Sequence, residues 1–209
     1  MSLIKQCEKL SLLYEEVVLN YSGTPEKAAF EFFEKQGYIG YYNEGSLILN
    51  VIKALMLDKL AELNIFNDRS DACSRYLEAQ LTILNEQTDS LISSIRQTSK
   101  SKFIANFQEI INTSYIKSSF PNLSVDLAVA LFDALDTNDF INVAQKISEE
   151  PYEFRKGWPD LTIIKGSEIR FIEVKTTDKL KKSQMKTIPE MNSILPCLFS
   201  VLKVEGKSI

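Results

Sequence analysis

Apolar side chains recur three or four residues apart along most of the chain, and this spacing predicts a largely helical protein. Residues 3–20 are the first such segment, with Ser2 as its cap. A second helix is predicted to begin at Thr24, where a hydroxyl precedes a proline and an acid, and to end at Gly37. The N-terminal part is therefore predicted to be two helices separated by a short break.

The middle of the chain contains one short strand and then only helices. Residues 38–42 predict the strand, and residues 43–45 predict a turn. Residues 47–63 form a strongly apolar helix that we expect to be buried. The remaining predicted helices share the same periodicity and lie near residues 69–84, 86–98, 102–117, 124–135 and 138–148. The sequence therefore predicts a helical block over about residues 67–148.

The pattern changes in the last third to strand, strand, helix, strand. Residues 161–164 and 169–175 are the first two strands, joined by a tight turn at residues 165–167. A helix over residues 182–194 is predicted to be interrupted at Pro189, and residues 198–204 form the closing strand. The chain is thus predicted to be an α/β protein, residues 1–209 forming one domain that carries a helical insertion.

Composition excludes several classes of chemistry. The chain has 209 residues, three widely spaced cysteines and no histidine. Serine–histidine and cysteine–histidine catalysis are therefore excluded, and a zinc or disulfide framework is not expected. No apolar run reaches the roughly 18 residues of a membrane helix, and the N-terminal segment is too charged for a signal peptide. We expect a soluble, cytoplasmic protein without membrane partners.

Charge is distributed unevenly along the chain. The net charge is −4, yet residues 151–188 contain nine lysines and arginines against five acids. A locally basic segment on an acidic protein is compatible with a surface that binds phosphates.

The candidate chemistry lies on the two strands of the last third. Asp160 directly precedes the first strand, whereas Glu173 and Lys175 are two apart on the second and so share a face. A hairpin would bring Asp160 beside Glu173. Two carboxylates can hold a hard cation such as Mg²⁺ or Mn²⁺, with the carbonyl of Val174 as a further ligand. Lysine can orient a water molecule or neutralise charge on a phosphate. Alone, Glu-x-Lys on a strand more often marks a surface hairpin.

The residues around these three carry a resemblance. The order Gly157-Trp158-Pro159-Asp160-Leu161, Glu173-Val174-Lys175, Asp178-Lys179-Leu180 and Gln184 resembles the VRR-NUC domain of the PD-(D/E)xK nuclease superfamily over about 30 residues. The resemblance implies a restriction-endonuclease-like mixed sheet flanked by helices. It also implies that Asp160 and Glu173 are metal ligands, Lys175 the catalytic lysine, and Gln184 a supporting amide.

A second resemblance lies upstream. Residues 36–45 and the apolar helix after them look like the start of the nuclease domain in Fanconi-associated nucleases, which also place a helical block before the Pro-Asp motif. In those proteins a glutamate followed by glycine supplies another metal-site carboxylate. This implies the same role for Glu44.

We expect the phosphate contacts to come from Arg155, Lys156, Lys179 and Lys182, although a solvated face explains such charges equally well. The function implied by the resemblance is an Mg²⁺- or Mn²⁺-dependent endonuclease or exonuclease. Its substrate would be flapped or branched DNA in repair. A dimeric Holliday-junction resolvase is one alternative, and a non-cleaving DNA-binding or interaction module is another. Because the helical block is large enough to cover a dimer face, we expect a monomer.

Overall fold

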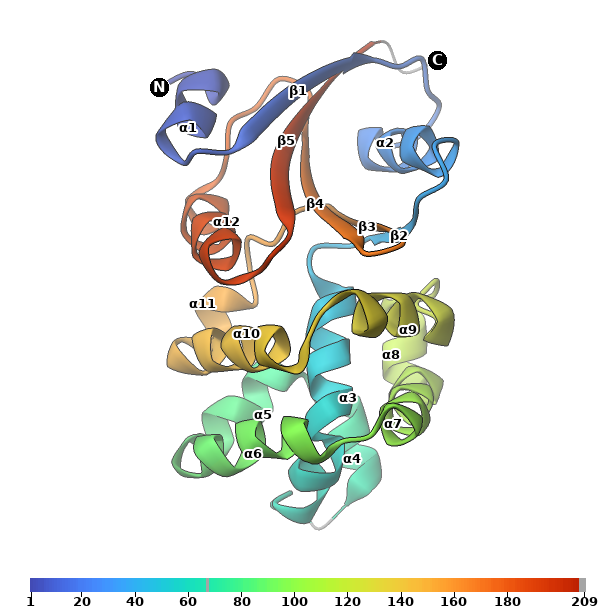
Figure 1. Ribbon diagram of the computed structural model, residues 1–209, viewed down its shortest axis with the longest axis vertical. Coiled ribbons are helices and arrows are strands. Elements are labelled where there is room, and N and C mark those ends of the chain that lie inside the picture. The colour runs from blue at the N-terminus through green and yellow to red at the C-terminus, as the bar shows by residue number, and fades with distance from the viewer. Residues whose placement is uncertain (67, 207–209) are drawn as a thin grey trace. The chain divides into compact units, whose positions relative to one another are not determined.

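The computed structural model describes residues 1–66 and 68–206 (Figure 1). The chain divides into two compact units. Met1–Gly45 and Lys156–Ile209 form the first, called here the sheet unit, and Ser46–Arg155 form the second, called the helical unit. The sheet unit is discontinuous in sequence, because the helical unit lies between its two segments. The assignment of both units to one domain stays a prediction.

The sheet unit contains all five strands of the described chain. Its elements are α1 (Leu3–Lys9), β1 (Leu13–Val18), α2 (Pro25–Glu34), β2 (Ile39–Tyr42), β3 (Leu161–Lys165), β4 (Glu168–Lys175), α12 (Lys182–Ile194) and β5 (Leu198–Glu205). The strand order is β1-β5-β4-β3-β2, in which β5 pairs parallel with both β1 and β4 while β3 pairs antiparallel with both β2 and β4. The predicted α/β class with a mixed sheet is confirmed.

Helices cover both faces of this sheet (Figure 1). Helix α2 lies on one face, and α1 and α12 lie on the other. Alternate residues of β4 therefore enter two different cores. Ile172 and Val174 pack with Phe33 of α2, whereas Phe171 stacks on Phe199 of β5 with ring centroids 4.8 Å apart.

The prediction of one helix over residues 3–20 is wrong. Helix α1 ends at Lys9, and the chain then forms β1 beside β5. Ser11 adopts a left-handed conformation with φ of 53°, and the N–H groups of Ser11 and Leu12 donate to the carbonyls of Glu8 and Cys7. These bonds close the helix as a Schellman motif, a role that glycine usually fills.

The prediction of an interruption at Pro189 is also wrong, because α12 continues through it. Proline removes one hydrogen bond from the helix, but Ile188 and Met191 on either side are fully buried and keep the helix on the sheet. Helix α2 is capped by Thr24 as expected but ends three residues before Gly37. The remaining strands and the last helix are confirmed within a few residues.

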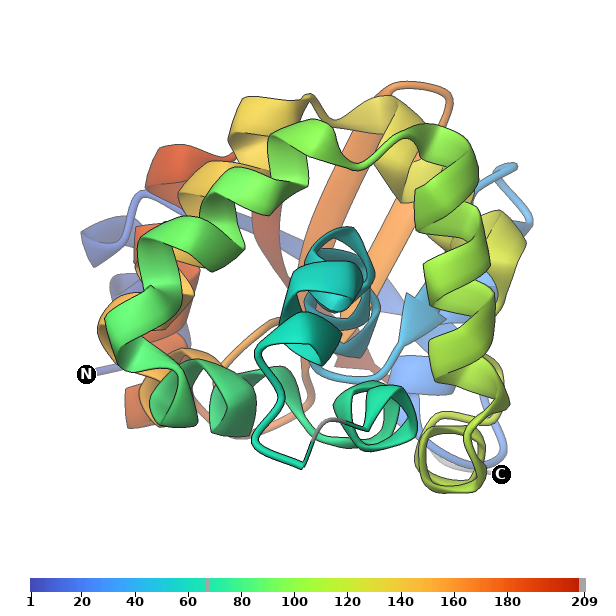
Figure 2. The same ribbon diagram turned by 90° about the horizontal axis from the view of Figure 1, so that it is seen from below.

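The helical unit is arranged around α3. Its elements are α3 (Ser46–Glu62), α4 (Arg69–Ser74), α5 (Leu77–Ile83), η1 (Asn85–Gln87), α6 (Thr88–Ser94), η2 (Ile95–Gln97), α7 (Lys100–Asn112), α8 (Ser114–Ser119), α9 (Val125–Ala134), α10 (Thr137–Glu149) and α11 (Pro151–Phe154). Helix α3 lies in the middle of a ring of helices and contacts α4, α5, α6, α7 and α9 (Figure 2). The predicted buried helix over residues 47–63 and the helical character of the block after it are confirmed. The segments expected near residues 69–84 and 102–117 are each divided into two helices. Within the described ranges, no helix combines the length and apolarity that crossing a membrane requires.

Candidate active site

The end of β4 carries two buried charged side chains. Glu173 is fully buried and Lys175 is 5% exposed. Both point to the face of the sheet opposite α2, since Ile172 and Val174 occupy the other face. The ammonium of Lys175 lies 2.6 Å from Oε1 of Glu173 and 3.5 Å from Asp178. The strand alternation therefore places the pair together as the sequence predicts.

Asp160 joins this pair from the start of β3. Its Oδ2 accepts a hydrogen bond of 2.8 Å from the backbone N–H of Val174. The antiparallel register that pairs Leu161 with Ile172 brings Asp160 to the end of β4. One carboxylate is thus fixed by the backbone of the strand that carries the other.

Gln184 connects α12 to the pair. Its Oε1 accepts a hydrogen bond of 2.8 Å from the N–H of Lys181, and its Nε2 donates to Oε1 of Glu173. The helix can approach this closely because residue 157 is glycine. A Cβ on Gly157, whose φ is +78°, would lie 2.4 Å from the backbone of Ser183. The glycine of the Gly-x-Pro-Asp motif therefore makes room for the helix that carries Gln184.

Burial and mutual repulsion shift the pKa values of the carboxyl groups. Burial, together with the neighbouring charge of Asp160, raises the pKa of Glu173 to about 8, against the opposing effect of Lys175. Burial also raises the pKa of Asp160, assisted by the charges of Glu26 and Glu44 and opposed by the Val174 N–H. Burial alone would lower the pKa of Lys175, but Glu173 outweighs it and the pKa is raised. Two buried carboxyl groups thus compete for one lysine, and each holds its proton more tightly than a free carboxyl group does.

The donor set fits a hard divalent cation. Oε2 of Glu173 is buried and has no hydrogen-bond partner within the described part of the chain. A buried carboxylate oxygen without a partner is costly unless a cation or another donor satisfies it. Asp160 and the carbonyl of Val174 add further oxygen ligands of the kind that Mg²⁺ and Mn²⁺ take. Across residues 1–66 and 68–206, no group of three acidic, cysteine or histidine side chains is already arranged around a metal position.

Glu44 lies in the same surface pocket as Asp160. The pocket is lined by Thr24, Glu26, Tyr42, Asn43, Glu44 and Asp160. Glu44 thus lines the same pocket as Asp160 although the two are distant in sequence, but within the described residues it does not complete a three-carboxylate cluster. Its role as a metal ligand stays a prediction.

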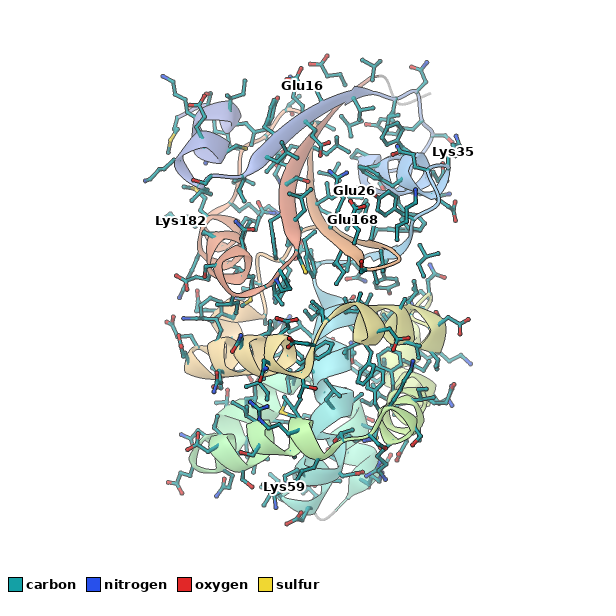
Figure 3. The ribbon with its side chains drawn as sticks, in the orientation of Figure 1. Glu16, Glu26, Lys35, Lys59, Glu168 and Lys182 are labelled. Carbon is teal, nitrogen blue, oxygen red and sulfur yellow. The ribbon has the colours of Figure 1, made fainter. Side chains whose placement is uncertain are left out.

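Glu26 is a residue of this pocket that the sequence did not indicate. It belongs to the first turn of α2, on the side of that helix that faces the sheet (Figure 3). An acid at this position is ordinarily explained by the helix dipole. From the sequence alone, Glu26 could therefore not be distinguished from an acid that only stabilises the N-terminus of its helix.

The predicted DNA-binding residues do not form one group. Lys179 and Lys182 are exposed next to the start of α12, where Figure 3 labels Lys182, and Lys156 is exposed before Gly157. Arg155 belongs to the helical unit, where it donates to Glu78 and lies over the ring of Tyr76. The structure brings together Asp160, Glu173, Val174, Lys175 and Gln184, but the role of each lysine as a phosphate contact stays a prediction.

Two further buried residues hold the loops of the site. Gln6 of α1 accepts from the N–H and donates to the carbonyl of Leu180, which fixes the segment between β4 and α12. Trp158 is fully buried between Gly45 and Phe171. Trp158 is thus a packing residue. Its contacts join the turn that carries Glu44 to the segment that carries Asp160.

Comparison with known proteins gives one family and one fold. The family model of the VRR-NUC domain matches residues 81–206. A crystal structure of paFAN1 bound to 2-nucleotide 5′-flap DNA with a gap is similar with a TM-score of 0.60 and 19% identity, over 92% of this chain and 38% of that chain. A second paFAN1 structure, with a 1-nucleotide 5′ flap, gives 0.61 and 20%, over 94% and 38%. The chain therefore spans well under half of paFAN1. No curated protein matches it.

Proposed function

The chain belongs to the VRR-NUC domain family, and from that premise we propose that it is a metal-dependent nuclease that hydrolyses DNA phosphodiester bonds. The observation that supports this most directly is the unpartnered Oε2 of Glu173, buried beside Asp160 and in contact with Lys175 through its other oxygen. A buried carboxylate oxygen without a donor is costly, and a cation bound there would offset that cost.

Asp160, Glu173 and the carbonyl of Val174 would hold the cation, and Glu44 and Glu26 line the surface pocket that Asp160 also lines. A bound Mg²⁺ or Mn²⁺ polarises a phosphate and lowers the pKa of a water ligand. We propose that either of these two ions can serve.

The other groups of the site orient the two carboxylates or neutralise negative charge on a phosphate. Lys175 can donate to a non-bridging phosphate oxygen or to the attacking water, since its ammonium lies at the end of β4. Gln184 holds Oε1 of Glu173, so that Oε2 keeps a fixed direction. The N–H of Val174 does the same for Asp160. The two carboxylates are therefore fixed before any ligand binds.

The proposed substrate is a DNA with a flap or branch. The support is the fold similarity to paFAN1, whose structures are described as bound to 5′-flap DNA. We further propose that the protein acts as a monomer that nicks one strand. A resolvase would instead need two sites related by a two-fold axis.

A cleavage panel of flap, four-way-junction, duplex and single-stranded DNA with Mg²⁺ or Mn²⁺ tests the proposal. Asp160→Asn, Glu173→Gln and Lys175→Met should each abolish cleavage while circular dichroism shows a folded protein. Glu168→Gln, at the exposed opposite end of β4, is the matched control and should cut normally. Cleavage by Lys175→Met at the wild-type rate would refute the site. A stable dimer in light scattering that makes paired, symmetric cuts in junctions would refute the flap nuclease and support a Holliday-junction resolvase.

A further inference from the structure

The helical unit carries a cluster of aromatic rings and one guanidinium group on its surface. Tyr76 and Tyr115 meet edge to face with ring centroids 5.4 Å apart, and their hydroxyls form a hydrogen bond of 2.7 Å. The guanidinium of Arg155 lies 5.3 Å from the centre of the Tyr76 ring. Tyr152 of α11 lies three residues before Arg155, the C-cap of that helix, so the two side chains are neighbours on one helix face. These four residues, Tyr76, Tyr115, Tyr152 and Arg155, are called here the aromatic platform.

Much of this platform is open to solvent. Tyr115 is 47% exposed and Tyr152 is 49% exposed, and 46% of the Arg155 side chain is accessible. Arg155 donates to Glu78 through Nη1, and its guanidinium carries further N–H groups that can serve a ligand. The platform thus offers ring faces, a guanidinium plane and charged donors side by side.

Buried polar groups hold the platform in place from below. The carbonyl of Arg75, next to Tyr76, accepts from the ammonium of Lys53 at 3.2 Å and from the amide of Gln80 at 3.0 Å. Lys53 is 1% exposed and also donates to the carbonyl of Cys73 at 2.7 Å. Glu78, 5% exposed at its side chain, fixes Arg155. A surface turn anchored by a buried lysine has its rings ordered before a partner binds, which reduces the entropy cost of binding.

We propose that the aromatic platform is a stacking site for the unpaired strand of a DNA substrate. A base can stack on the exposed Arg155 guanidinium, whose carbon lies 5.3 Å from the centre of the Tyr76 ring, and neighbouring bases can stack on Tyr115 and Tyr152. The spare guanidinium N–H groups then reach a phosphate. Paired bases are stacked within the duplex and offer no such faces, so the platform selects an unpaired strand. The identification of DNA rests on the proposed nuclease function.

Binding of an oligothymidylate, measured by fluorescence anisotropy in EDTA, tests the platform without cleavage. Tyr115→Ala combined with Tyr152→Ala should weaken binding about fivefold or more, since stacking on one ring contributes about 1–3 kcal/mol. The Tyr→Phe pair keeps the rings and should bind within about twofold of wild type, although Tyr115→Phe removes the hydroxyl bond to Tyr76. Arg155→Lys keeps the charge but loses the plane, and should bind more weakly. Tyr14→Ala in the sheet unit is the matched control.

The outcomes separate this inference from the proposed function. If the alanine pair binds oligothymidylate as tightly as wild type, the platform is not a DNA site, whether or not the protein cuts DNA. If the Phe pair loses as much affinity as the alanine pair, stacking is not the interaction and the inference fails. If the alanine pair abolishes binding but wild type cuts DNA no better than Asp160→Asn, the platform is a DNA site and the proposed nuclease function is wrong.

Discussion

The substitution Gly45→Ala tests how the site is assembled. Gly45 follows Glu44 and has φ of +67°, a conformation that alanine adopts only with strain. An added Cβ would lie 2.4 Å from Cγ of Trp158 and 2.7 Å from its Cβ. Trp158 is fully buried and precedes the Pro159-Asp160 segment, so it cannot move without moving the carboxylate.

The expected loss of stability has two parts. Left-handed backbone costs alanine about 1–2 kcal/mol, and forcing a methyl group into a packed core costs about 1–3 kcal/mol more. Gly166 provides a matched control, because its φ is +61° and nothing lies within 4 Å of an added Cβ. Gly166→Ala should therefore lose only the first part, whereas Gly45→Ala should lose about 2–5 kcal/mol.

The assay uses a property of the chain itself. Trp158 is its one tryptophan, so fluorescence excited at 295 nm reports on this position and on the unfolding of the sheet around it. Gly45→Ala should shift the emission to longer wavelength, lower the urea midpoint and reduce DNA cleavage. Gly166→Ala should lower the midpoint less and leave the native emission and the cleavage unchanged.

Gly45→Ala and Gly166→Ala should differ both in the free energy of unfolding and in native emission. If Gly45→Ala and Gly166→Ala had the same free energy of unfolding and the same native emission, the collision with Trp158 would not exist. The link between the Glu44 turn and the Asp160 segment would then have to be abandoned.

Three further outcomes are expected. Gln184→Ala should lower kcat about 10- to 100-fold, because Glu173 loses the amide that orients it, and should also lower the urea midpoint, because the buried amide accepts from the N–H of Lys181. Burial lowers the pKa of Lys53 to about 8 from the ordinary value of 10.5. The unfolded chain then binds more protons between these values, so wild type should gain up to about 3 kcal/mol over Lys53→Met from pH 8 to 10.5 in urea titrations. Ser11→Gly should raise the free energy of unfolding in urea titrations by about 0.5–1 kcal/mol, because it relieves the left-handed strain.

The carboxylate pair and the lysine could be predicted from local rules. Strand alternation alone places Glu173 and Lys175 on one face, and a tight turn at residues 165–167 brings Asp160 to them. Gln184 followed only from the resemblance, since no periodicity shows which helical amide reaches a neighbouring strand. The same holds for Glu44, whose distance from Asp160 in sequence hides their common pocket.

Other features depended on contacts that no local pattern records. Ser11 ends α1 without a glycine, so the apolar spacing continued past the real end of the helix. Glu26 looked like an ordinary first-turn acid because its approach to Asp160 depends on how α2 packs on the sheet. Arg155 was grouped with Lys156 by adjacency, although the boundary between the two units falls between them.

The interruption of the sheet by the helical unit has a consequence for folding order. Tyr42 of β2 pairs with Leu161 of β3, although all of α3 to α11 lies between them. Closing a long unfolded segment costs chain entropy, and contacts between residues distant in sequence form slowly. The helices between them pack around α3 as a separate compact unit and can form first, which shortens the segment that remains to be closed. Glu44 and Asp160 flank that closure, so the pocket they share is completed only when β2 has paired with β3.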